Sequence, residues 1–121
     1  GKARPKFARL PNGMVKTYTP KATASWEDNI RLQALEHRPA QLLDGPLAAQ
    51  ITFYLPRPKS APRRVTMPAT KPDLDNLAKA VFDALEGIIY INDSRFVRKN
   101  LEKRYGDPPR VEVVIQEANA G

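Results

Sequence analysis

The sequence predicts an α+β fold, because helical and strand patterns of apolar residues both occur in one short chain. Residues 73–87 carry apolar side chains at helical spacing, whereas residues 47–55 and 110–116 carry them at alternate positions. A length of 121 residues with 41% hydrophobic content suits one compact core. We therefore expect residues 1–121 to form a single domain in which two helices pack on a small sheet.

The N-terminal part gives the weaker signals. Residues 1–20 are rich in Pro, Gly and Lys/Arg and predict an extended loop with a short strand at 15–18. The chain opens abruptly on this basic segment, so we expect that a first strand is missing from it. A helix is expected from Thr23 or Ser25, since Ser25 and Asp28 resemble a capping box, and Pro39 follows its end.

The central part is predicted to contain a strand and a long basic loop. Residues 47–55 read as a strand with Ile51 and Phe53 on one face. Residues 56–72 hold five prolines, which excludes a helix or a central strand. A loop of this length in a small domain is usually functional or disordered, and its many cations favour a function.

The C-terminal part gives the strongest helix and two strands. Residues 73–87 predict an amphipathic helix that Gly87 terminates. Residues 96–105 and 110–116 predict strands separated by a Gly-Asp-Pro-Pro turn at 106–109. We expect these two strands to pair as a hairpin.

Composition narrows the classes of function. The chain has no cysteine, which excludes disulfides, zinc–cysteine sites and thiol catalysis. It shows no apolar run long enough to span a bilayer and no signal-peptide pattern, so we expect a soluble, cytoplasmic protein without a membrane partner. A net charge of +7 favours a polyanionic partner such as nucleic acid.

Two aspartates, Asp73 and Asp75, stand one residue apart at the start of the strongest helix. A lone aspartate there is usually an N-cap. A second carboxylate two positions away is redundant for capping and repels the first unless a cation lies between them. Because oxygen ligands suit Mg²⁺ and phosphodiester hydrolysis suits metal-activated water, the pair predicts a metal site for phosphate chemistry.

Two further residues have open interpretations. Lys79 either forms surface ion pairs along its helix or lies near a scissile phosphate. Asp93 is either a turn residue or a third metal ligand. A helix of about 15 residues spans roughly 22 Å, and the four residues 88–91 reach back only about 13 Å. Spacing therefore does not bring Asp93 to Asp75 within one chain, although a neighbouring subunit could supply it.

Residues 71–97, KPDLDNLAKAVFDALEGIIYINDSRFV, resemble the core motif of the RusA-type Holliday junction resolvases, which are crossover junction endodeoxyribonucleases often found in phages and prophages. The likeness extends to YTPKAT, ITFYLPRP and KRYG, so it covers nearly the whole chain. It implies a mixed sheet, a homodimer, and Mg²⁺-dependent incision of four-way junctions and other branched DNA in recombination and repair, with Mn²⁺ as an alternative ion. A bacterial or phage origin is also implied.

The resemblance assigns roles to particular residues. Asp73, Asp75 and Asp93 would be catalytic and hold the metal, and Lys79 would be the essential lysine. In the second loop, Asn92 stands where family members often carry an acid. From their charge, the expected phosphate contacts are Lys71, Arg57, Lys59, Arg63, Arg64 and Lys103.

Three other functions compete with the resolvase interpretation. A non-catalytic basic DNA-binding module would explain the positive net charge, but it gives the aspartates no catalytic role. A metal-dependent phosphotransferase or nucleotide hydrolase would use the same acids but needs a nucleoside pocket, which no pattern in the sequence predicts. A structural or interaction protein would use the aspartates only as helix caps.

Overall fold

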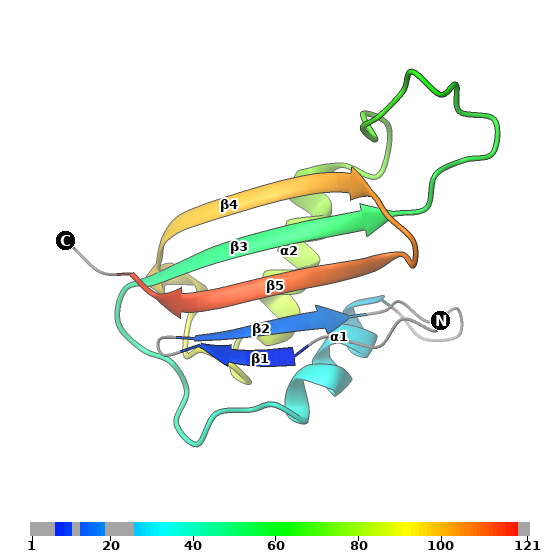
Figure 1. Ribbon diagram of the computed structural model, residues 1–121. Helices are drawn as coiled ribbons and strands as arrows, with labels where there is room; N and C mark the ends of the chain where they lie inside the picture. The colour runs from blue at the N-terminus through cyan, green and yellow to red at the C-terminus, as the bar shows by residue number, and fades with distance from the viewer. Residues whose placement is uncertain (1–6, 11–12, 19–25, 119–121) are drawn as a thin grey trace.

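The computed structural model describes residues 7–10, 13–18 and 26–118, which form a five-stranded sheet and two α-helices (Figure 1). The expected α+β class is therefore confirmed. The elements in chain order are β1 (Phe7–Leu10), β2 (Gly13–Tyr18), α1 (Trp26–Leu35), β3 (Leu47–Leu55), α2 (Leu74–Leu85), the short 3₁₀ helix η1 (Asp93–Arg95), β4 (Phe96–Tyr105) and β5 (Arg110–Glu117).

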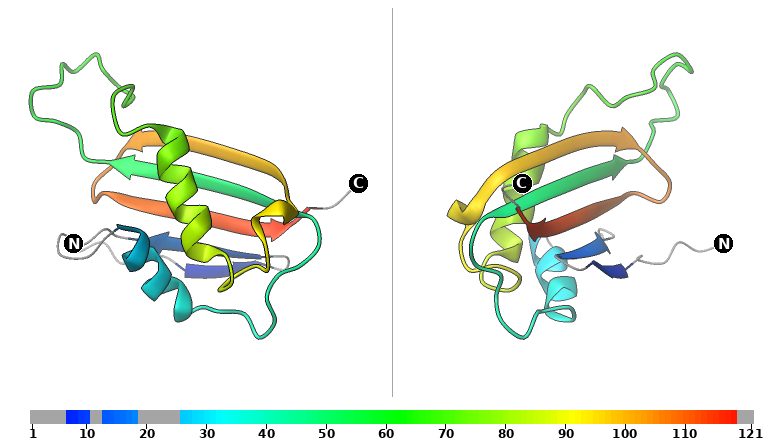
Figure 2. Two further views of the ribbon diagram at one scale, coloured as in Figure 1. Left: turned by 180° about the vertical axis from the view of Figure 1, so that it is seen from behind. Right: turned by 60° about the vertical axis from the view of Figure 1, so that its left-hand side comes forward.

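The sheet is mixed, with the strand order β1-β2-β5-β3-β4. Strands β3 and β4 run parallel, whereas the other neighbouring strands are antiparallel. Both α-helices cover the same face of the sheet, and none of the described residues forms an α-helix on the opposite face (Figure 2). None of the described helices is long and apolar enough to cross a membrane.

The expected hairpin between β4 and β5 is wrong, because β3 lies between these two strands. Phe53 of β3 pairs with Lys103 on one side and with Val111 on the other. β3 is almost entirely apolar and mostly buried, which suits a central strand, whereas β4 is largely exposed and carries many charges, which suits an edge. The turn at 106–109 therefore crosses the end of β3, where the Gly106 N–H donates to the Leu55 carbonyl oxygen at 3.0 Å.

This crossing brings Gly106 against the ring of Tyr54 and leaves no room for a side chain. A Cβ at position 106 would lie 2.5 Å from Tyr54 Cδ1 and 2.8 Å from Tyr54 Cβ. We expect Gly106→Ala to lower the free energy of unfolding by about 1–3 kcal/mol, measured by urea denaturation. In a Tyr54→Gly background the same substitution should cost much less; an equal cost in both backgrounds would show that the contact is not the cause.

The N-terminal expectations are met in part. The short strand at 15–18 is confirmed and extends over Gly13–Tyr18, but Phe7–Leu10 forms a strand where a loop was expected. β1 pairs with β2 along four positions, so a tertiary partner overrides the loop-like composition. The expected helix starts at Thr23 or Ser25 lie outside the described residues, in which α1 begins at Trp26.

One apolar core lies between the helices and the sheet. α2 contributes Ala78, Val81, Phe82 and Leu85, and they join a cluster with residues of α1, β3 and β5. The helix stops as expected, since Gly87 has a positive φ of 83° that favours glycine. α2 is thus fixed on the sheet, while Asp73 and Asp75 at its start and Lys79 and Asp83 on its polar face stay exposed.

Candidate active site

Asp73 and Asp75 lie at the N-terminal end of α2 with their carboxylates exposed. Asp73 occupies the N-cap position with extended backbone angles, φ −67° and ψ 137°, yet its side chain makes no capping hydrogen bond. Asp75 follows in the first turn, where the helix dipole favours negative charge. Within the described part of the chain neither carboxylate has a hydrogen-bond or ion-pair partner, so capping does not explain the pair.

A hollow opens beside Asp73, the first acid of the pair. It has a volume of about 510 Å³ and is lined by Lys71, Pro72, Asp73 and Asn76. A second hollow of about 410 Å³ lies on the sheet face without helices, where its one acid, Glu112, is already bonded to Arg110 at 3.0 Å. A third hollow holds Asp44, whose carboxylate is ion-paired with Arg95. Of these three hollows in the described chain, the one at Asp73 has an acid without an ion-pair partner, which suits a cation.

Asp93 lies near the other end of α2. Its N–H donates to Glu86 Oε1 at 2.6 Å, and Glu86 directly follows the helix. With 12 residues, α2 is about 18 Å long. Leu43 holds residues 88–91, which connect α2 to the loop of Asp93, at this end of the helix. The Leu43 N–H donates to the Ile89 carbonyl oxygen, and the Leu43 carbonyl oxygen accepts from the Ile91 N–H, both at 2.9 Å.

The structure therefore does not bring the three expected acids together in one chain. Among the described residues, no group of three or more His, Cys, Asp or Glu side chains could hold a metal ion. This agrees with the spacing argument, in which residues 88–91 are too short to carry Asp93 back along the helix. Asp73 and Asp75 remain a pair at one end of α2.

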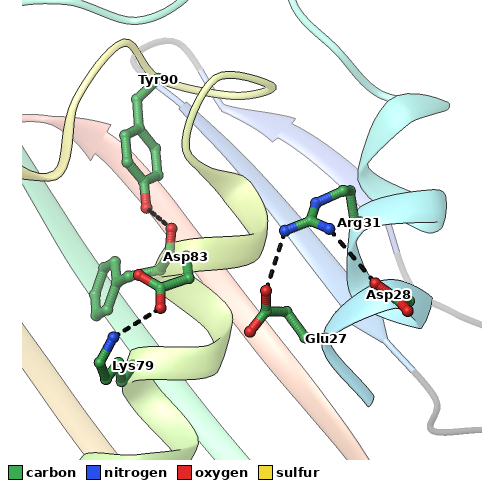
Figure 3. Close-up of polar contacts among 7 residues, drawn as sticks. Glu27, Asp28, Arg31, Lys79, Asp83 and Tyr90 are labelled. Carbon is green, nitrogen blue, oxygen red and sulfur yellow. Dashed lines mark hydrogen bonds and ion pairs between the residues drawn. The ribbon is translucent and has the colours of Figure 1, made fainter. Parts of the chain in front are cut away.

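Lys79 lies on the exposed face of α2, one turn beyond Asp75. Its Nζ donates to Asp83 Oδ2 at 2.9 Å (Figure 3), which is the surface ion pair that one of the two interpretations expected. This bond raises the pKa of Lys79, and the carboxylates of Glu27 and Asp93 add smaller contributions in the same direction. Lys79 is thus a stable positive charge at neutral pH, which suits electrostatic stabilisation better than proton donation.

The six expected phosphate contacts fall into two groups. Arg57 and Lys103 are used within the protein: Arg57 donates to the carbonyl oxygens of Val65 and Pro62, and Lys103 donates to those of Thr70 and Pro72. The other four are exposed, and none of them has a hydrogen-bond or ion-pair partner in the described chain; they are Lys59, Arg63, Arg64 and Lys71. Their loop projects beyond the ends of β3 and β4 (Figure 1).

Two residues near Asp93 were not expected from the sequence. Lys99 Nζ lies 3.3 Å from Asp93 Oδ1 and 4.0 Å from the centre of the Phe82 ring. Glu86 accepts from the Asp93 N–H, as described above. Alternation along β4 could have placed Lys99 and Lys103 on one face, but no local pattern marks Glu86, which looks like any acid after a helix.

Comparisons with known proteins identify the family of this chain. The sequence model of the family described as "Endodeoxyribonuclease RusA" matches residues 1–116. The uncharacterized protein YqaN of Bacillus subtilis (strain 168) is 36% identical over 121 aligned residues, which cover 92% of this chain and 85% of YqaN. The periplasmic domain of Helicobacter pylori MotB matches 95% of this chain and 80% of its own with a TM-score of 0.49 and 12% identity, a likeness too weak to inform fold or function. Because the family match spans nearly the whole chain, the protein belongs to the RusA family of endodeoxyribonucleases.

Proposed function

We propose that this protein is a Mg²⁺-dependent endonuclease that incises four-way junctions and other branched DNA in recombination and repair. The observation that carries the proposal is the acid pair, Asp73 and Asp75. In the described chain neither carboxylate has a hydrogen-bond or ion-pair partner, and Asp73 lines a hollow. The pair follows a loop in which Lys59, Arg63, Arg64 and Lys71 have no such partner either, in a chain of net charge +7. Charge of both signs at one place suits a polyanionic substrate that is cut with the help of a cation.

The donor atoms of the acid pair fit Mg²⁺. Enzymes commonly hold this ion through one or two carboxylates together with waters and substrate phosphates, so Asp73 and Asp75 could provide one chain's share. Mn²⁺ accepts the same oxygen ligands and is the alternative ion. When bound, the ion supplies Lewis-acid polarisation of the phosphate and a nucleophile at neutral pH.

The chain's own residues supply binding and charge stabilisation. The loop cations Lys59, Arg63, Arg64 and Lys71 would contact the phosphate backbone and set the position of the DNA. Lys79, one turn from Asp75 and held protonated by Asp83, would stabilise the negative charge that develops on the phosphate. In this proposal Arg57 and Lys103 shape the loop instead of contacting DNA.

We further propose that the active form is a homodimer in which Asp93 of one copy completes the acid pair of the other. Asp93 lies near the C-terminal end of α2 and Asp75 lies in its first turn, and no group of three acids forms in the described part of one chain, so a second copy would have to bring them together. Two apolar residues near Asp93, Ile91 and Val97, are 46% and 65% exposed and would contribute to such a contact. A two-fold dimer also matches the two-fold symmetry of a four-way junction, with one site on each of two opposed strands.

A non-catalytic basic DNA-binding module is the second candidate. The observation that favours it is that, in the described chain, no set of three acids gathers to hold a metal. Such a module would bind junctions through the loop cations, with an affinity that falls steeply with salt. Such a module would leave every DNA strand of the junction uncut.

Incision of a synthetic mobile four-way junction separates the two candidates. The wild-type protein is incubated with the junction and with a linear duplex of the same sequence, each with and without Mg²⁺. We expect paired incisions in the junction only when Mg²⁺ is present, and much slower cutting of the duplex. Salt-dependent junction binding without any incision would reject the nuclease and support the binding module.

A further inference from the structure

We infer that Lys103 is a positioning residue for the acid pair: it fixes the segment that leads into Asp73 and does not contact DNA. This inference deepens the proposed function and rests on it. The starting point is the orientation of β4. Lys103 pairs with Phe53, which is buried on the helix-covered face. Because paired residues in neighbouring strands share a face, the Lys103 side chain points toward the α2 side of the sheet.

The contacts of Lys103 are with the main chain. Its Nζ donates to the Thr70 carbonyl oxygen at 2.7 Å and to the Pro72 carbonyl oxygen at 2.9 Å. A lysine ammonium has three N–H donors, so two of them are committed to these bonds. Both carbonyls belong to the three residues that precede Asp73, and bonds from a charged donor are stronger than bonds between neutral groups.

These two bonds are the main polar restraint on that segment. Within the described chain no other hydrogen bond reaches residues 66–72, and Pro68 is the one buried residue among them. Asp73 then begins α2, where its carbonyl oxygen accepts from the Leu77 N–H at 3.1 Å. The position of the Asp73 carboxylate relative to Asp75 therefore depends on where Lys103 holds the entering chain.

Three possible roles of Lys103 predict different kinetics. As a DNA contact, its loss would raise the KM for the junction. As a nearby positive charge only, its loss would lower the Mg²⁺ concentration needed, because a cation repels the ion. As a positioning residue, its loss would lower kcat and raise the Mg²⁺ requirement, since misplacement of catalytic groups by about 1 Å can cost about 100-fold in rate.

The test compares Lys103→Met, Lys103→Arg and the control Arg98→Met in junction incision. Arg98 is also on β4 but lines the hollow on the opposite sheet face, so the control removes the same charge elsewhere. We expect Lys103→Met to lower kcat by roughly 10- to 100-fold with a KM within about twofold, and to need more Mg²⁺. Lys103→Arg should recover part of kcat, because a guanidinium can also donate to two carbonyls. A rise in KM alone, or a change equal to that of Arg98→Met, would overturn the inference.

Amide hydrogen exchange in the free protein tests the restraint without any catalysis. The Leu77 N–H, which donates to the Asp73 carbonyl oxygen at 3.1 Å, should exchange faster in Lys103→Met than in wild type or Arg98→Met, while the core of β3 exchanges at the same rate in all three. Unchanged exchange at Leu77 would overturn the positioning role. If wild type cut no junction, the proposed nuclease function would fall, and the exchange result would still decide whether Lys103 holds this segment.

Discussion

Asp75→Asn should reduce Mg²⁺-dependent incision of a four-way junction by at least about 100-fold, because loss of even an outer-sphere partner of a metal ligand costs about 10- to 100-fold. Junction binding without Mg²⁺ should be unchanged or tighter, since the substitution removes a negative charge that repels DNA. The Asp75 carboxylate makes no hydrogen bond or ion pair in the described chain, so the fold loses little. We expect the melting temperature to stay close to that of wild type, as only a favourable interaction with the helix dipole is lost.

The matched control for this substitution is Asp107→Asn. Asp107 is exposed in the turn between β4 and β5 and also has no partner in the described chain, so the change in charge and shape is the same. Incision by Asp107→Asn should stay near the wild-type rate. A wild-type rate for Asp75→Asn would reject Asp75 as a metal ligand, and equal losses in the two variants would point to a general effect of charge.

Mixing two inactive variants should restore incision if the site is shared between subunits. In the proposed dimer, Asp75→Asn and Asp93→Asn each disable both sites when alone. A mixed dimer regains one intact site, because the acid pair comes from the Asp93→Asn copy and Asp93 comes from the Asp75→Asn copy. With random exchange about half of the dimers are mixed, and each has one of two sites, so nicking should return to roughly a quarter of the wild-type rate.

The readout is single-strand nicking of the junction after the two variants are refolded together, with each variant refolded alone as the control. A site within one subunit would give no restoration, because every site would carry one defect. Wild-type incision by Asp93→Asn alone would instead remove Asp93 from the metal site. Each of these results is distinguishable from the restored nicking that we expect.

Much of the fold follows from local patterns in the sequence. The bounds of β3 and β4 agree with the prediction, and α2 differs by one or two residues at each end, because all three have strong apolar periodicity or clear turn residues. Which strands pair with one another was harder to predict from the sequence. Alternation in β5 and the turn residues that follow β4 mark both as strands, but they carry no information that β3 separates them.

The site shows the same division between local and distant information. Asp73 and Asp75 are conspicuous because two carboxylates exceed what a helix cap needs, and the reach of residues 88–91 correctly separates Asp93 from them in one chain. The partners of Lys103 lie 31 and 33 residues away in the sequence, and both are main-chain carbonyls. Carbonyl groups have no sequence signature, so a lysine that holds the main chain looks the same as one that faces DNA.

The basic loop has both of its ends tied to the final residues of β4. Near its start, the Arg57 guanidinium lies 5.2 Å from the centre of the Tyr105 ring, and near its end Lys103 holds Thr70 and Pro72. The sheet therefore sets the distance between the two ends of the loop. The free-energy cost of closing a flexible loop, which is entropic, rises by only about 0.6 kcal/mol for each doubling of the loop's length. Insertions and deletions between these ties can change how far the cations extend, while the acid pair stays at the same place on the sheet. Reach toward the substrate and placement of the acids are in this way separately adjustable in evolution.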